Sequence, residues 1–164
     1  LHKAGVVLDD GMIYWDVRPS AKFPTVEVRV ADVPSTVAET VLLATLIRAT
    51  VMTALDEERR GRPSPPLTPH ALKAAYWKSA HDGLDGQAID LLDSHAPVLA
   101  RELLEHLVER IRPALEAVGD YDMAKDELAR IAEQGNGAMR QRRAWQRRHD
   151  VKDVIAELAA ATLS

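Results

Sequence analysis

The segment that decides the fold is residues 13–32, which read IYWDVRPSAKFPTVEVRVAD. Apolar and polar residues alternate over 11–18 and again over 25–31, and this period of two is typical of strands with one buried face. The loop between the two stretches is bounded by Pro19 and Pro24, and proline is excluded from the interior of a sheet ladder. We therefore predict an antiparallel pair of strands.

Charged residues share one face of this predicted pair: Asp16, Arg18, Glu27 and Arg29. A carboxylate and guanidinium groups aimed in the same direction can hold a divalent cation and phosphate oxygens. The same pattern also marks a solvated sheet face with cross-strand ion pairs. Spacing alone favours the solvated face.

The rest of the chain is predicted to be mainly helical. Thr36 and Glu39 have capping-box spacing, which predicts a helix that runs to Gly61. Thr68 followed by Pro69 predicts the start of a second helix. Amphipathic patterns predict further helices at 100–118, 122–134, 137–148 and 151–161.

Two details qualify this helical pattern. Pro113 should bend or break the helix at 100–118. Residues 89–98 fit a short hairpin around Asp93 and Ser94 as well as they fit a loop. The predicted fold class is α+β, with a short antiparallel strand pair followed by a mainly helical bundle.

The composition is that of a soluble globular domain, with 164 residues, 46% hydrophobic and 28% charged. A net charge of -4 argues against a nucleic-acid binder, which is normally basic. The chain has no cysteine, which excludes disulfides and thiolate metal sites and leaves the cytoplasm as the default location. Charged and threonine residues interrupt the most apolar stretch, 37–55, so we expect no membrane-spanning segment.

A second candidate site is the basic run at 140–148, in which five arginines surround Trp145. Arginines with an aromatic ring would suit nucleic-acid phosphates and bases. On a helix, however, these arginines spread over most of the circumference, and Asp153 and Glu157 are near enough to compensate them. We expect a solvated helix surface that docks partly on acidic helices of the same protein.

The segment 13–32 closely resembles the W-D-x-R-P-S-x-x-F-x-T-x-E-x-R-x-x-D segment of the bacterial type 2 glutamate–cysteine ligases, a family of carboxylate–amine ligases. The resemblance continues through GLDG at 83–86 and GNGA at 135–138, followed by Arg140-Gln141-Arg142. It covers nearly the whole chain. The strand motif is the specific part, because it fixes many unlike residues in order, and the C-terminal match is looser.

The resemblance implies a glutamine-synthetase-like catalytic sheet, to which the strand pair would belong. It also implies an ATP-dependent reaction that joins the γ-carboxyl of glutamate to an amine such as cysteine through an acyl phosphate, with Mg²⁺ neutralising phosphate charge. Glu27 would then be a metal ligand. Arg29 would be a catalytic residue facing the transferred phosphate, and Arg18 a second catalytic cation near nucleotide or phosphate. Both arginines are thus expected to bind ATP.

Family members also carry upstream strands with further metal and substrate contacts, and nothing in this sequence matches them. The chain opens at Leu1, next to strand-like sequence, so we expect a fragment that is inactive alone. The missing N-terminal half would lie in cis or on a separate chain, and a homo-oligomer is left open. Residues 1–62 would hold the last strands and first helix of the catalytic sheet domain, and 63–164 its helical C-terminal region.

The alternative from another class is a non-catalytic helical binding or scaffolding module. We expect small-molecule substrates, and neither a nucleic-acid nor a membrane partner. His81 stands near the end of the second predicted helix, where the family pattern leads us to expect an arginine.

Overall fold

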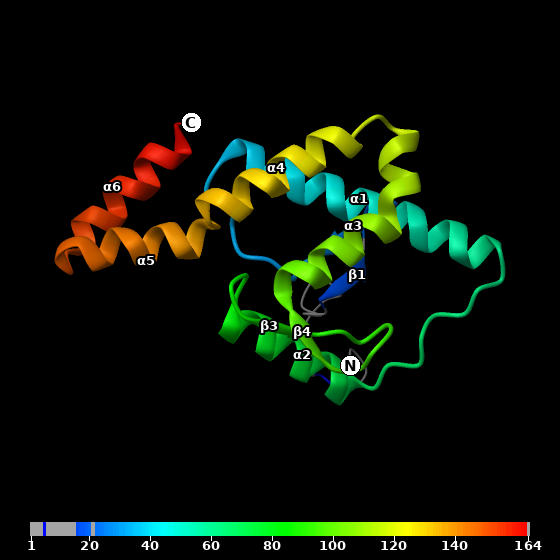
Figure 1. Cartoon of the computed structure of the whole chain (residues 1–164). Helices are drawn as coiled ribbons and strands as arrows, with labels where there is room; N and C mark the ends of the chain where they lie inside the picture. The colour runs from blue at the N-terminus through cyan, green and yellow to red at the C-terminus, as the bar shows by residue number, and fades with distance from the viewer. Residues whose placement is uncertain (1–4, 6–15, 21, 164) are drawn as a thin grey trace. The chain divides into compact units, whose positions relative to one another are not determined.

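In the computed structural model, the described residues are 5, 16–20 and 22–163, and the chain divides into two compact units, residues 1–33 and 34–164. The strands and helices of both units are shown in Figure 1. The division falls well before residue 62, where the sequence analysis placed its boundary. That boundary concerns the whole family protein, and it stays a prediction.

In the first unit, β1 (Val17–Pro19) pairs antiparallel with β2 (Val26–Val28), which confirms the predicted strand pair. The register sets Arg18 directly opposite Glu27. The N–H of Arg29 donates to the carbonyl of Asp16 at 2.7 Å and continues the pairing beyond the strands. The charged side chains of both strands are therefore brought to one place by backbone pairing.

β2 is shorter than the strand that the sequence predicts. The expected spans were 11–18 and 25–31, but residues 11–15 lie outside the described part of the chain. The loop that follows β1 is held by Ser20, whose Oγ accepts hydrogen bonds from the N–H groups of Lys22 and Phe23. These bonds satisfy loop amides locally, so the chain reverses without a tight two-residue turn.

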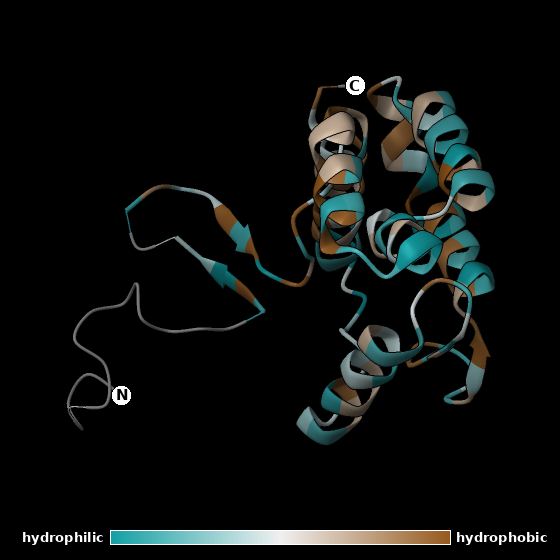
Figure 2. Cartoon of the chain, turned by 90° about the vertical axis from the view of Figure 1, so that its left-hand side faces the viewer, coloured by the Kyte–Doolittle hydropathy of each residue, from teal (hydrophilic) through white to brown (hydrophobic). Residues whose placement is uncertain are grey.

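The second unit contains six helices and a hairpin in the described residues: α1 (Val37–Arg59), α2 (Pro69–Asp82), β3 (Gln87–Ile89), β4 (Pro97–Leu99), α3 (Ala100–Ala117), α4 (Tyr121–Gln134), α5 (Gly137–Arg148) and α6 (Val151–Thr162). Each predicted helix is present with nearly the predicted bounds. Hydrophilic and hydrophobic residues follow one another along these helices (Figure 2), as in amphipathic helices. The mainly helical α+β fold class is confirmed.

Helix caps explain why the bounds were predictable. Thr36 accepts the N–H of Glu39 at 3.1 Å, and Thr68 accepts the N–H of Ala71 at 3.2 Å. The expected reciprocal bond of a capping box differs, because the Glu39 carboxylate accepts the N–H of Ser35, at 3.0 Å, and not that of Thr36. The cap therefore closes one residue earlier than predicted.

The short hairpin β3–β4 is present, so of the two alternatives for 89–98 the hairpin is confirmed. Its loop is organised by Asp90, which is buried. The Asp90 carboxylate accepts N–H bonds from Leu92, Asp93 and Ser94 at 3.0–3.1 Å. One side chain thereby satisfies backbone donors that a loop would otherwise leave unpaired.

The core of this unit lies between α1, α3 and α4. Its buried members are Leu42, Ala49, Val108, Ile111, Leu115 and Ala124. Helix α3 continues through Pro113, so of the two alternatives predicted there, a bend or a break, the break is absent. The helix spacing of Val108, Ile111 and Leu115 places all three on the face that meets α1 and α4.

Helix α1 is long and apolar enough to cross a membrane, judged by length and composition only. This is weak evidence, because core helices of soluble proteins pass the same test. Leu42, Thr45 and Ala49 of α1 are buried within the protein. The absence of a membrane partner stays a prediction.

Helices α5 and α6 pack chiefly on each other and form an arm, residues 137–162 (orange to red in Figure 1). Within it, Ala144 is buried in α5, and α6 has no buried residue. This arm differs from the core helices, each of which contributes apolar residues to a shared interior.

Candidate functional site

The strand pair brings together the three residues that the sequence analysis singled out. Arg18 donates to Oε2 of Glu27 from Nε at 3.0 Å and from Nη2 at 2.8 Å. Arg29 donates to the same oxygen from Nη2 at 3.0 Å. The cross-strand ion pair expected from the register is therefore present, and the i, i+2 spacing of Glu27 and Arg29 aims both side chains at it.

These contacts leave the two carboxylate oxygens of Glu27 unequal. All three hydrogen bonds fall on Oε2, and Oε1 accepts none from the part of the chain that the structure describes. The bonds from Arg18, then its charge and the contacts of Arg29, lower the pKa of Glu27 below its usual value. Glu27 is therefore ionised at neutral pH, and Oε1 is the oxygen that the contacts of the described residues leave for a cation.

Burial differs between the two arginines. The side chain of Arg18 is 9% exposed, whereas that of Arg29 is 40% exposed. The guanidinium of Arg18 is thus largely shielded from solvent beside its carboxylate, whereas that of Arg29 is the more accessible of the two to an incoming anion. This geometry suits a carboxylate that binds a cation beside two guanidinium groups that bind phosphate oxygens.

The opposite face of the strand pair was predicted to be its buried side. Val17, Val26 and Val30 are exposed instead, and Arg18 on the charged face is buried. Ile13 and Trp15, which the alternation assigned to the same apolar face, lie outside the described residues. The alternation therefore predicted correctly which residues share a face of the strand pair. It did not predict which of the two faces is buried.

A metal site needs more ligands than Glu27 alone supplies. Among the residues described, no group of three or more histidine, aspartate or glutamate side chains could hold a metal ion. Mg²⁺ binds few protein carboxylates and keeps several waters or phosphate oxygens as ligands. The described residues around the strand pair therefore fit Mg²⁺ as contributors of one ligand, Oε1 of Glu27.

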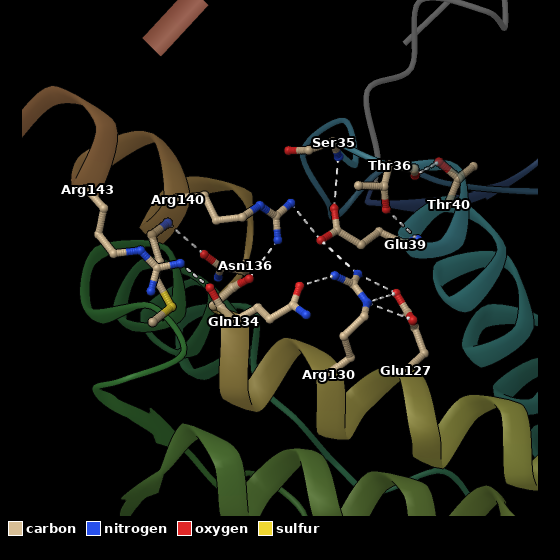
Figure 3. Close-up of polar contacts among 12 residues, drawn as sticks. Ser35, Thr36, Glu39, Thr40, Glu127, Arg130, Gln134, Asn136, Arg140 and Arg143 are labelled. Atoms are coloured by element: carbon tan, nitrogen blue, oxygen red, sulfur yellow. Dashed lines mark hydrogen bonds and ion pairs between the residues drawn. The ribbon is translucent and has the colours of Figure 1, made fainter. Parts of the chain in front are cut away.

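A second polar cluster joins α1, α4 and α5 (Figure 3). Oε1 of Glu39 lies 2.7 Å from Nη2 of Arg140 and 3.4 Å from Nη2 of Arg130. The contact with Arg140 is an ion pair without the alignment of a hydrogen bond. Arg130 also contacts Glu127, and Arg140 donates from Nη1 to the carbonyl of Gly135 at 2.7 Å.

Burial raises the pKa of Glu39, but the guanidinium of Arg140, the N–H of Ser35 and the charge of Arg130 outweigh it, so the pKa lies below its usual value. Sequence reasoning missed this cluster, because it assigned Glu39 to a cap and Arg140 to the basic run. The two residues are far apart in the chain, and no local spacing links them. The cluster connects helices and presents no free carboxylate pair, so we interpret it as structural.

The basic run behaves mainly as the compensated surface that its sequence predicted. Arg148 pairs with Asp153, with Nε 3.0 Å from Oδ2, and Arg147 lies 4.0 Å from Glu157. Arg143 donates to the backbone carbonyl of Gln134. The arginines therefore dock partly on α6 and on the end of α4.

Asn136, in the turn before α5, caps the helix by accepting the N–H of Met139 at 3.0 Å. The glycine–asparagine–glycine turn at 135–137 thus serves as a helix-to-helix connection.

His81 lies at the surface in a small local cluster. Its ring stacks on Trp77 with 4.8 Å between ring centroids, and its Nδ1 lies 2.8 Å from Oδ1 of Asp82. The contacts of His81 and Lys78 lower the pKa of Asp82 to about 2. These contacts join neighbours along one helix, which indicates a surface role for His81.

A hollow of about 880 Å³ lies between α2, the β3–β4 hairpin and α3. It is lined mainly by apolar residues, and two of its charged groups are engaged elsewhere: Asp90 by loop amides and Arg110 by Glu57. An apolar hollow of this kind does not suit the phosphates of a nucleotide. The strand pair remains the better candidate site.

Comparison with known proteins identifies the class to which these features belong. The sequence profile of Glutamate-cysteine ligase family 2 (GCS2) matches residues 1–157. The chain therefore belongs to this family.

Actinobacterial relatives are similar to the chain over its whole length. A protein of Mycolicibacterium smegmatis named "Putative glutamate--cysteine ligase 2-3" is 66% identical over 164 residues, which is 100% of this chain and 45% of the relative. A protein of Nocardia farcinica named "Putative glutamate--cysteine ligase 2-1" is 52% identical over 160 residues, 98% of this chain and 42% of the relative. The chain spans less than half the length of these relatives and matches their C-terminal part.

Proposed function

We propose that this chain contributes part of the active site of an ATP-dependent carboxylate–amine ligase of the glutamate–cysteine ligase type. ATP would transfer its γ-phosphoryl group to the γ-carboxyl of glutamate. An amine such as that of cysteine would then attack the acyl phosphate and release inorganic phosphate. The observation that carries the proposal is the Arg18–Glu27–Arg29 cluster in a member of the GCS2 family.

Each residue of the cluster has a role that its geometry supports. Glu27 offers Oε1 to a cation while Oε2 is held by guanidinium groups. Arg29, the more exposed cation, would face the transferred phosphate, and Arg18 would hold Glu27 in place and contact nucleotide or phosphate oxygens. Mg²⁺, when bound, would neutralise charge on the phosphates.

The complete activity requires the longer family protein, because Glu27 supplies a single carboxylate. The remaining ligands and the glutamate and amine sites would come from the N-terminal part, in cis or as a separate chain. The 164-residue chain alone is expected to show no glutamate-dependent ADP release. The cytoplasm, where ATP is supplied, is the proposed location.

The test uses a full-length chimera in which this chain replaces the matched segment of the Mycolicibacterium smegmatis relative. Glu27→Gln should lower glutamate-dependent ADP release about a hundredfold, since it removes the anionic metal ligand. It should also raise the Mg²⁺ concentration needed for half-maximal nucleotide binding, measured by titration calorimetry.

Glu116→Gln is the matched control, because Glu116 is also a carboxylate paired with an arginine at the surface, Arg112. It should leave both readouts within about twofold of the parent. Full activity of the Glu27→Gln chimera would contradict the proposal and favour a non-catalytic binding or scaffolding module.

A further inference from the structure

The arm formed by α5 and α6 carries an apolar surface that its own unit does not cover. Val151, Ile155 and Leu158 of α6 are exposed by 58%, 59% and 37%. Their spacing of four and three residues places them on one side of the helix, which we call the outer stripe. An apolar stripe of this kind is typical of a helix that packs against a partner.

The other side of α6 is already occupied by α5. Asp153 pairs with Arg148, Glu157 lies near Arg147, and Val154 is half-buried. On a helix with about 3.6 residues per turn, Asp153 and Glu157 lie roughly a third to a half of a turn from the outer stripe, and Val154 lies about a fifth of a turn from it. The contact with α5 therefore leaves the outer stripe available.

The arm also lacks the burial that normally stabilises helices of this size. Each helix is 12 residues long, and Ala144 is the buried residue that the pair contributes. Helices shorter than about 12–15 residues are marginal in water unless an apolar face is packed. The arm therefore requires cover from outside the described contacts.

We propose that the outer stripe docks on an apolar surface of the N-terminal part of the family protein. The relatives carry more than half of their length outside the matched C-terminal segment. The family profile extends through residue 157, so most of α6, including Val151 and Ile155, belongs to the shared family segment. That N-terminal part is present in the relatives described above and lies outside this chain.

The base of the arm lies where the chain enters the second unit from its N-terminal side. Arg140 pairs with Glu39 there, and Figure 3 shows both near Ser35. Gly137 approaches Ser35 so closely that a Cβ on Gly137 would lie 2.4 Å from the Ser35 Oγ. The arm is thus anchored beside Ser35 and Glu39, at the start of the second unit. This position favours a partner from the part of the family protein that precedes the unit in sequence.

The experiment uses the absence of cysteine in this chain. A single cysteine is introduced as Ile155→Cys, with Val118→Cys as the matched control on an exposed residue at the end of α3. Maleimide labelling is measured for the 164-residue chain and for the full-length chimera, with peptide mass spectrometry to identify the labelled site. In the chimera, Ile155→Cys should label at least about tenfold more slowly than in the chain alone, while Val118→Cys changes by less than about twofold.

Equal labelling of Ile155→Cys in both proteins would overturn the proposal. So would equal slowing at both positions, or protection that disappears on dilution, since the last result identifies a second copy as the partner. As a second measurement, Ile155→Asp should lower the Tm of the chimera but leave that of the 164-residue chain unchanged. An unchanged chimera Tm would count against the proposal. The inference rests on family membership, and labelling is independent of ligase activity, so the two proposals can fail separately.

Discussion

The three-helix core and the α5–α6 arm belong to the same unit but are stabilised differently. The core buries Leu42, Ile111 and Leu115 from helices distant in sequence. The arm buries Ala144, and its connection to the unit includes the ion pair between Arg140 and Glu39. Apolar burial therefore stabilises the core, whereas the arm depends on a polar anchor and presents an apolar surface that its own unit leaves uncovered.

The contrast between core and arm predicts that a substitution in the core lowers the free energy of unfolding the most. Leu115 is fully buried, so Leu115→Ala should lower the free energy of unfolding by about 3 kcal/mol through lost burial and a residual cavity. Urea denaturation of the 164-residue chain measures it. Leu163→Ala, at a residue that is 90% exposed, should change stability by less than about 0.5 kcal/mol. Equal effects at both positions would show that the described core is not the main source of stability.

The next largest loss of stability should come from the ion pair between Glu39 and Arg140, which anchors the arm. Glu39→Gln removes the charge facing Arg130 and Arg140 and should cost about 2 kcal/mol, because it leaves a poorly compensated, largely buried guanidinium at Arg140. Glu116→Gln, which breaks an exposed pair, is the control. If the two variants have the same unfolding midpoint in urea, the anchor contributes no more than a surface ion pair.

Acid should weaken the β3–β4 hairpin while neutral pH leaves it intact. Backbone N–H groups of Ser94, Asp93 and Leu92 lower the pKa of Asp90 from 3.8 to about 2. Because the folded pKa is below the unfolded one, the stabilisation is present above pH 3.8 and is lost as pH falls toward 2. Asp90→Asn should make stability depend less on pH between pH 3.8 and about 2. Urea unfolding midpoints measured across this pH range test the prediction. A curve of unchanged steepness would rule out Asp90 as its source.

The smallest effect is expected on the surface of the arm. Arg148 pairs with Asp153, but its side chain is 72% exposed, so Arg148→Ala should change the free energy of unfolding by less than about 0.5 kcal/mol. Thermal unfolding at low and at high salt provides the measurement. A loss comparable to that of Glu39→Gln would mean that the arginine run holds the arm more strongly than its anchor.

Much of the local structure could be predicted because its causes are local. Thr36 and Thr68 accept helix N–H groups three residues ahead, and Gly61, Gly83 and Gly135 adopt positive φ where helices end. The antiparallel strand pair and the shared face of Arg18, Glu27 and Arg29 follow from the period of two.

Other features were not settled by the sequence pattern. The hairpin at 87–99 could not be distinguished from a loop, because Asp90 stabilises it only when its carboxylate is turned inward onto the loop amides. Of the bend or break predicted at Pro113, the break is absent, and α3 continues to the packed residue Leu115. Tertiary packing can offset the hydrogen bond that a proline removes from a helix.

The sequence by itself determined the order and ends of the helices, the strand pairing and the candidate residues Arg18, Glu27 and Arg29. These depend on side chains within a few positions of one another, where spacing sets direction. The tertiary structure alone decided that Glu39 anchors Arg140, that all three guanidinium contacts fall on one oxygen of Glu27, and that the arm presents an uncovered stripe. Such features arise when segments far apart in the chain meet, and local patterns carry no information on which partners will meet.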